Sequence, residues 1–147
     1  MKTIFYYLII FILFSLVGCK EQTNEPEPVY GTNYELWRSY NIHNYSIEQV
    51  RLCFCGYAGE MMKITVHSDT LSSVIKLSDL TVLPPQNAKY YLTIDSLFGL
   101  IEHGAYDSID VSYNAKYGYP EKVNVDPQLQ EVDGGIIYET SNLVILK

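Results

Sequence analysis

The chain has 147 residues, of which 48% are hydrophobic and 18% are charged, so its length fits one domain and its composition excludes a largely disordered protein. The formal net charge is −7, and ten Lys and Arg against seventeen Asp and Glu leave little for the basic patch that a nucleic-acid-binding protein carries. Three cysteines are too few for a disulfide-dense mini-scaffold.

The first segment, residues 1–19, has the pattern of a secretory signal. Lys2 gives a positive start, and the apolar run that follows is shorter than the ~20 residues that cross a membrane. The sequence Leu16-Val17-Gly18-Cys19 resembles a bacterial lipobox. That resemblance implies a lipoprotein signal peptide over residues 1–18 and a diacylglycerol on the Cys19 thiol. The alternatives are a plain secretory signal and an uncleaved anchor.

Lipid attachment at Cys19 predicts a protein of the bacterial cell envelope whose membrane contact is the anchor itself, because several acyl chains hold more firmly than one. Lys20 replaces the Asp that retains lipoproteins in the inner membrane of enterobacteria, so the resemblance implies the outer membrane. Residues 19–29 contain three Glu and two Pro and predict a disordered tether behind the lipidated cysteine. Residues 30–147 are then expected to form a single α+β domain.

Hydrophobic periodicity predicts the first four elements of this domain. Asn33 is a candidate N-cap of a short helix that continues to Tyr40. Alternation of apolar and polar residues then predicts a long strand over residues 45–55, in which the apolar residues change faces and so indicate a bulge or bend. Two cleaner strands are predicted over residues 62–67 and 71–77, joined by a short turn.

The second half of the chain is again predicted to contain one helix followed by three strands. Residues 81–89 contain two prolines and predict a crossover loop, and Thr93 is a strong N-cap for a helix that Gly104 ends. Three further strands are predicted over residues 108–113, 121–125 and 136–146. The order α-β-β-β-α-β-β-β predicts an α+β fold, in which an antiparallel β-sheet has two helices packed on one face.

The Cys53-Phe54-Cys55 sequence holds the two cysteines that remain besides Cys19. An exported protein meets an oxidising compartment, but residues i and i+2 of a flat strand have Cα atoms ~6.6 Å apart, at the upper edge of the disulfide range. A bridge therefore needs a bulge or kink, which Gly56 makes easy. Three alternatives stay open: a local structural disulfide, two reduced buried thiols, and a thiol-redox or metal-handling site.

Metal, cofactor and catalytic patterns are weak in this sequence. A zinc site can draw on His67 with Cys53 and Cys55, but structural zinc takes four ligands and no second Cys/His pair is present. The late acids lack calcium-loop spacing and predict a solvated rim; they are Asp107, Asp110, Glu121, Asp126, Glu131 and Asp133. No nucleophile, metalloprotease or phosphate-loop motif is found, so we expect no catalytic residue, metal or cofactor.

A tyrosine-rich stretch lies near the end of the domain. Tyr113, Tyr117 and Tyr119 flank a Gly-x-Pro turn over residues 113–120. Exposed tyrosines are common at binding surfaces, so these three form a candidate surface for an envelope protein or polymer. In the alternative interpretation, the rings pack on the sheet and the turn with their hydroxyls at the rim.

An ordered set of residues resembles a family of uncharacterised bacterial lipoproteins that share a domain of unknown function. The set is Trp37, Tyr45, Cys53-x-Cys55, Ile64-Thr65-Val66, Ile94-Asp95-Ser96-Leu97-Phe98, Tyr113-Asn114, Gly118-Tyr119-Pro120 and Val125-Asp126. The resemblance spans about residues 34–133 and implies an envelope location and a small α+β domain. It supplies no activity or substrate.

The predicted function is therefore that of a lipid-anchored envelope protein with a non-catalytic binding or structural domain. The alternative is a thiol-redox or metal-handling protein that uses Cys53 and Cys55.

Overall fold

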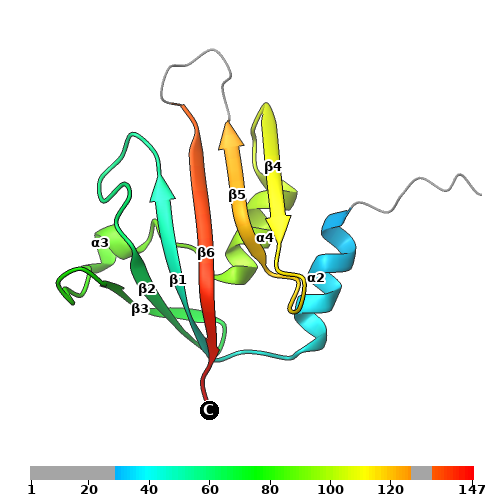
Figure 1. Cartoon of the computed structure of the whole chain (residues 1–147), viewed down its shortest axis with the longest axis horizontal. Coiled ribbons are helices and arrows are strands. Elements are labelled where there is room, and N and C mark those ends of the chain that lie inside the picture. Colours follow the sequence, from blue (N-terminus) through cyan, green and yellow to red (C-terminus); the bar gives the residue numbers. More distant parts are fainter. Residues whose placement is uncertain (1–28, 127–133) are drawn as a thin grey trace, which may run out of the picture.

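A computed structural model describes residues 29–126 and 134–147 (Figure 1). The predicted signal peptide, Cys19 and most of the predicted tether lie outside the described residues, as do Glu131 and Asp133. The described helices and strands are α2 (Val29–Ser39), β1 (Tyr45–Leu52), β2 (Met62–His67), β3 (Thr70–Lys76), α3 (Pro85–Ala88), α4 (Ile94–His103), β4 (Ser108–Tyr113), β5 (Pro120–Asp126) and β6 (Ile136–Ile145).

The six strands form one antiparallel sheet in the order β3-β2-β1-β6-β5-β4. The last strand of the chain lies beside the first, so the β1–β6 pairing joins the two three-stranded halves at the centre of the sheet (Figure 1). The broad α+β class is confirmed, and so is the main order of two long helices, each followed by three strands. The short helix α3 is an addition within the predicted crossover loop.

One face of the sheet carries the core because alternate strand residues point to the same side. On this face, Tyr45 and Ile47 of β1 are fully buried, together with Ile64 of β2. Helix α2 covers them through Trp37, whose ring meets Tyr45 edge-on at 5.6 Å between centroids. Helix α4 joins the same core cluster through Phe98. Both helices therefore pack on one face, and α4 lies behind β5 and β4 in Figure 1.

The start of α4 is held on β1 by two buried side chains. The Tyr45 hydroxyl accepts a hydrogen bond from the Ile94 amide at 3.0 Å, and Gln49, which is 0% exposed, bonds both the amide and the carbonyl of Leu92. Thr93 caps the helix as predicted, with its hydroxyl accepting from the Ser96 amide at 3.1 Å. These bonds determine which side chains of α4 face the end of α2.

Two predicted boundaries are wrong. Helix α2 begins at Val29, before the predicted cap Asn33, so that cap is not used. The strand predicted over residues 45–55 ends at Leu52, because the Gly59 amide bonds the Arg51 carbonyl at 2.8 Å and closes a turn there. Within the described residues, no helix is long and apolar enough to cross a membrane.

Candidate functional site

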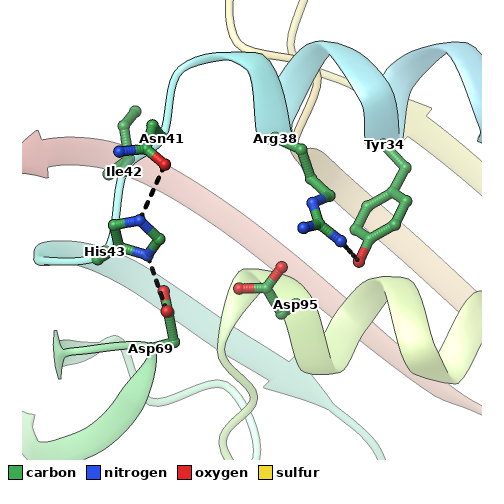
Figure 2. Close-up of a pocket in the computed structure, with 7 residues that line it drawn as sticks. All are labelled: Tyr34, Arg38, Asn41, Ile42, His43, Asp69 and Asp95. Atoms are coloured by element: carbon green, nitrogen blue, oxygen red, sulfur yellow. Dashed lines mark hydrogen bonds and ion pairs between the residues drawn. The ribbon is translucent and has the colours of Figure 1, made fainter.

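A polar cleft of about 310 Å³ lies between the end of α2, the β2–β3 turn and the start of α4 (Figure 2). Its lining residues are Tyr34, Arg38, Asn41, Ile42, His43, Asp69 and Asp95. Asn41 and Asp69 adopt left-handed backbone conformations, φ 51° and 62°, which Asn and Asp tolerate better than most residues. The Asp69 amide also donates to the His43 carbonyl at 3.1 Å, which fixes the two loops against each other.

The imidazole of His43 is held between two oxygen atoms. Nδ1 lies 2.8 Å from Asp69 Oδ2, and Nε2 lies 3.1 Å from Asn41 Oδ1. Figure 2 shows the ring between the side chains of Asn41 and Asp69. A His–Asp pair can serve as a general base, but the seven lining residues include no Ser, Thr or Cys that the base could activate.

Asp95 faces the His43–Asp69 pair from the first turn of α4 (Figure 2). Burial raises the pKa of the Asp95 carboxyl, and the Asp69 carboxylate raises it further. A hydrogen bond with the Trp37 side chain and the positive charges of Arg38 and His43 lower this pKa in part. Among the described residues, Asp95 has no ion-pair partner. Two carboxyl groups thus face one cleft, and Asp95 is the one that lacks an ion pair among the described residues.

Arg38 is the cation of the opposite wall. Its Nη1 atom donates to the Tyr34 hydroxyl at 3.5 Å, and its guanidinium lies 5.6 Å from the centre of the Tyr34 ring. Figure 2 shows Arg38 directed toward Tyr34, with Asp95 between it and His43. No sequence motif assigns a role to His43, Arg38 or Asp95 in a cleft. His43 and Asp69 are 26 positions apart, and no local pattern links them.

Cys53 and Cys55 lie outside the cleft, in the turn after β1. Their sulfur atoms are at disulfide-bonding distance, and their Cα atoms are 5.2 Å apart, closer than a flat strand allows. Cys55 is exposed and Cys53 is half-buried, so the alternative of two buried thiols does not fit. Arg51 Nη2 donates to Cys55 Sγ at 3.3 Å and lies 3.8 Å from Cys53 Sγ.

The zinc set considered from the sequence is not brought together. His67 ends β2 beside the first residues of β1, whereas Cys53 and Cys55 follow the last residue of β1, at the other end of that strand. His103 lies at the C-terminus of α4, 3.3 Å from a Glu102 oxygen. Over the described ranges, no group of three or more His, Cys, Asp or Glu residues is arranged to hold a metal ion.

The tyrosine-rich stretch is largely packed. Tyr119 is 4% exposed and meets the Trp37 ring edge-on, so its predicted place on a binding surface is wrong. Tyr113 stacks on Phe98, and Tyr117 packs against Tyr40. Gly118, between Tyr117 and Tyr119, adopts φ 77°, a left-handed conformation that glycine takes without strain.

The polar residues of this turn hold the loop together. Asn114 Oδ1 accepts from the amides of Lys116 and Tyr117, at 3.1 and 2.8 Å. Its Nδ2 donates to Glu121 at 2.7 Å, so both ends of the side chain are engaged in the turn. Asp107 and Asp110 are exposed, whereas Glu121 and Asp126 are half-buried, so only the first two of these acids match the predicted solvated rim.

Comparison with known proteins identifies the family of this chain. The model of DUF6174, a family of unknown function, matches residues 30–145, which include nearly all of the described residues. Comparisons with curated proteins and with solved structures give no match. Because the matched segment covers well over half of its length, the chain belongs to the DUF6174 family of unknown function.

Proposed function

We propose that this chain is a lipid-anchored protein of the bacterial cell envelope whose domain binds a partner without chemical catalysis. The binding site is the cleft between α2, the β2–β3 turn and α4, and the ligand group is a primary ammonium carried by an envelope protein or polymer. The observation that carries the proposal is the pair of carboxyl groups, Asp69 and Asp95, that face this cleft.

The electrostatics of the cleft favour a cation. Asp95 is partly buried and has no described ion-pair partner, so a bound ammonium offsets both its desolvation and its repulsion from Asp69. Lysine side chains and amino sugars carry such a group, which a cleft of about 310 Å³ can admit. Arg38, which lies on α2 across from Asp95, is placed to repel a ligand that brings a second positive charge to this side of the cleft.

Binding can be tested with trilysine amide as the probe and the full chain, purified from bacterial membranes in detergent. We expect NMR shift changes at the amides of His43, Asp69 and Asp95 during titration. Asp95→Asn should weaken binding at least ~5-fold, since it removes one close charge interaction. Asp110→Asn is the matched control, because this carboxylate is exposed on β4. Equal binding by the Asp95 variant contradicts the cleft assignment.

The anchor has its own test. In cells fed radiolabelled palmitate, the chain should take up label, and Cys19→Ser should abolish the label and move the protein out of the membrane fraction. Sucrose-gradient separation of the two membranes then tests the outer-membrane location. Label that persists in the Cys19→Ser variant contradicts lipidation at this residue, whatever the result of the ligand titration.

A further inference from the structure

Arg51 is a buried cation that the proposed ligand site does not use. It lies at the end of β1, is 6% exposed, and has no ion pair with any residue that the structure describes. Its Nε atom has no hydrogen-bond partner in the part of the chain that the structure describes, and its guanidinium lies over the rings of Tyr90 and Tyr91 at 5.3 and 5.2 Å. Buried arginines are almost always paired, because an uncompensated charge is costly in a protein interior.

No ionisable group among the described residues forms an ion pair with Arg51. Burial raises the pKa of the Tyr91 and Tyr138 hydroxyls, and the guanidinium only partly opposes that rise. Both tyrosines are therefore neutral at pH 7. The acid of the same loop, Glu60, accepts a hydrogen bond from the Ser78 hydroxyl at 3.3 Å and forms no described ion pair with Arg51. Among the described residues, the guanidinium therefore contacts neutral tyrosine hydroxyls, which can accept a hydrogen bond but carry no charge, and the sulfur atoms of Cys53 and Cys55.

We propose that Cys53 and Cys55 form a redox-active disulfide that exchanges with protein dithiols, and that Arg51 positions and stabilises the thiolate of Cys55. A disulfide sulfur is only a weak hydrogen-bond acceptor, whereas a thiolate carries a full negative charge. Arg51 therefore gains a charge partner only when the pair is reduced, which favours the reduced form.

The surroundings of Cys53 and Cys55 suit thiol–disulfide exchange better than a structural disulfide that stabilises the fold. A bridge between residues two apart closes a very small loop and restricts the unfolded chain little. Cys55 is exposed, and Phe54 between the two cysteines is 87% exposed, so an incoming protein can reach the sulfur and contact an apolar side chain. We therefore assign Cys55 as the sulfur that is attacked and Cys53 as its resolving partner.

The exchange balances with a dithiol as the reductant. A thiolate of the dithiol attacks Cys55 Sγ, a mixed disulfide forms, the Cys53–Cys55 bond breaks, and Cys53 leaves as a thiolate that takes a proton. The second thiolate of the dithiol attacks its own sulfur in the mixed disulfide, and Cys55 leaves as a thiolate beside Arg51. The dithiol loses two electrons and two protons. This chain gains two electrons and one proton, and the other proton goes to water.

The first experiment measures the ionisation of Cys55. In the full chain carrying Cys53→Ser, the rate of alkylation by iodoacetamide is followed from pH 5 to 10, with the product assigned to Cys55 by peptide mass spectrometry. We expect a midpoint at or below about pH 7.5, against ~8.5 for an ordinary thiol. A midpoint at or above about pH 8.5 overturns the proposal. Because mass spectrometry identifies the alkylated peptide, any reaction at Cys19 is not counted in the measured rate.

The second experiment measures the redox equilibrium in dithiothreitol buffers. Arg51→Met should shift it at least ~10-fold toward the disulfide, or about 30 mV, whereas Arg51→Lys should retain part of the effect. Lys63→Met, which removes an exposed cation from β2, is the matched control and should leave the redox equilibrium unchanged.

An unchanged equilibrium in a folded Arg51→Met variant overturns the role of Arg51. If that variant does not fold, the Arg51→Lys shift and the Cys55 midpoint decide. Asp95→Asn should leave both readouts unchanged, which separates this proposal from ligand binding.

Discussion

At the scale of single residues, the Asp95 carboxylate is expected to serve the proposed binding site and to lower the free energy of unfolding. Its folded-state pKa is raised above the ordinary value of 3.8, mainly by burial, although it lies in the first helical turn, where the dipole favours a carboxylate. A raised pKa means that the protonated group stabilises the fold below the unfolded value, and that this stabilisation is lost as the pH rises through the folded value.

We therefore expect Asp95→Asn to be more stable than the wild type at pH 7, and the difference to vanish at about pH 3. Urea unfolding at the two pH values measures this, with Asp110→Asn as the exposed control. A variant that is less stable at pH 7 means that the charge supports α4 after all. The first outcome is typical of a residue retained for binding rather than for folding.

Gly118 makes a second prediction at this scale. It adopts φ 77°, and a Cβ atom there would collide with the Asn33 carbonyl oxygen and lie 3.1 Å from Leu36 Cβ. We expect Gly118→Ala to lower the free energy of unfolding by about 2 kcal/mol or more, because backbone strain and overlap add. Gly99→Ala is the contrast, since that helical position has open space and should gain about 0.5–1 kcal/mol. Equal effects in denaturant unfolding contradict this account.

At the scale of elements, the position of α4 depends on its first turn. The Thr93 hydroxyl satisfies the Ser96 amide, which otherwise has no helical partner. Thr93→Ala should therefore cost about 1 kcal/mol of stability, and Thr93→Ser should restore most of it. Thermal unfolding of the three proteins provides the measurement. Because α4 carries Asp95, the Ala variant should also weaken trilysine binding. If Thr93→Ala changes neither stability nor binding, the cap does not position α4 at the cleft.

At the scale of the whole molecule, the central position of β6 makes the C-terminus essential. β6 pairs with β1 on one side and with β5 on the other, so it is the connection between the halves of the sheet. Removing residues 136–147 should abolish the cooperative unfolding transition, because the core face would be exposed along both broken edges. Removing Lys147 alone should have little effect. Circular dichroism during heating distinguishes the two, and a shortened chain that still unfolds cooperatively contradicts the central role of β6.

Much of the local structure could be predicted from the sequence. Period-two alternation over residues 62–67 and 108–113 matches β2 and β4, and the Thr93 cap and Gly104 stop delimit α4 as the structure has it. These features depend on residues close together in the chain, where backbone geometry and solvent exposure determine the outcome. The end of β1 differs from the prediction because alternation continues through Cys55, whereas a turn closed by the Gly59 amide on the Arg51 carbonyl ends the strand.

The sequence by itself determined the α+β class, the order of the main elements and the membership of residues 30–145 in one family. Only the tertiary structure decided the order of strands in the sheet, the burial of Tyr119, and the meeting of His43, Asp69 and Asp95 in one cleft. It also placed a buried Arg51 against two cysteines. The physical reason is distance along the chain: periodicity reports neighbours within a few residues, whereas these groups meet only when the core closes over the sheet.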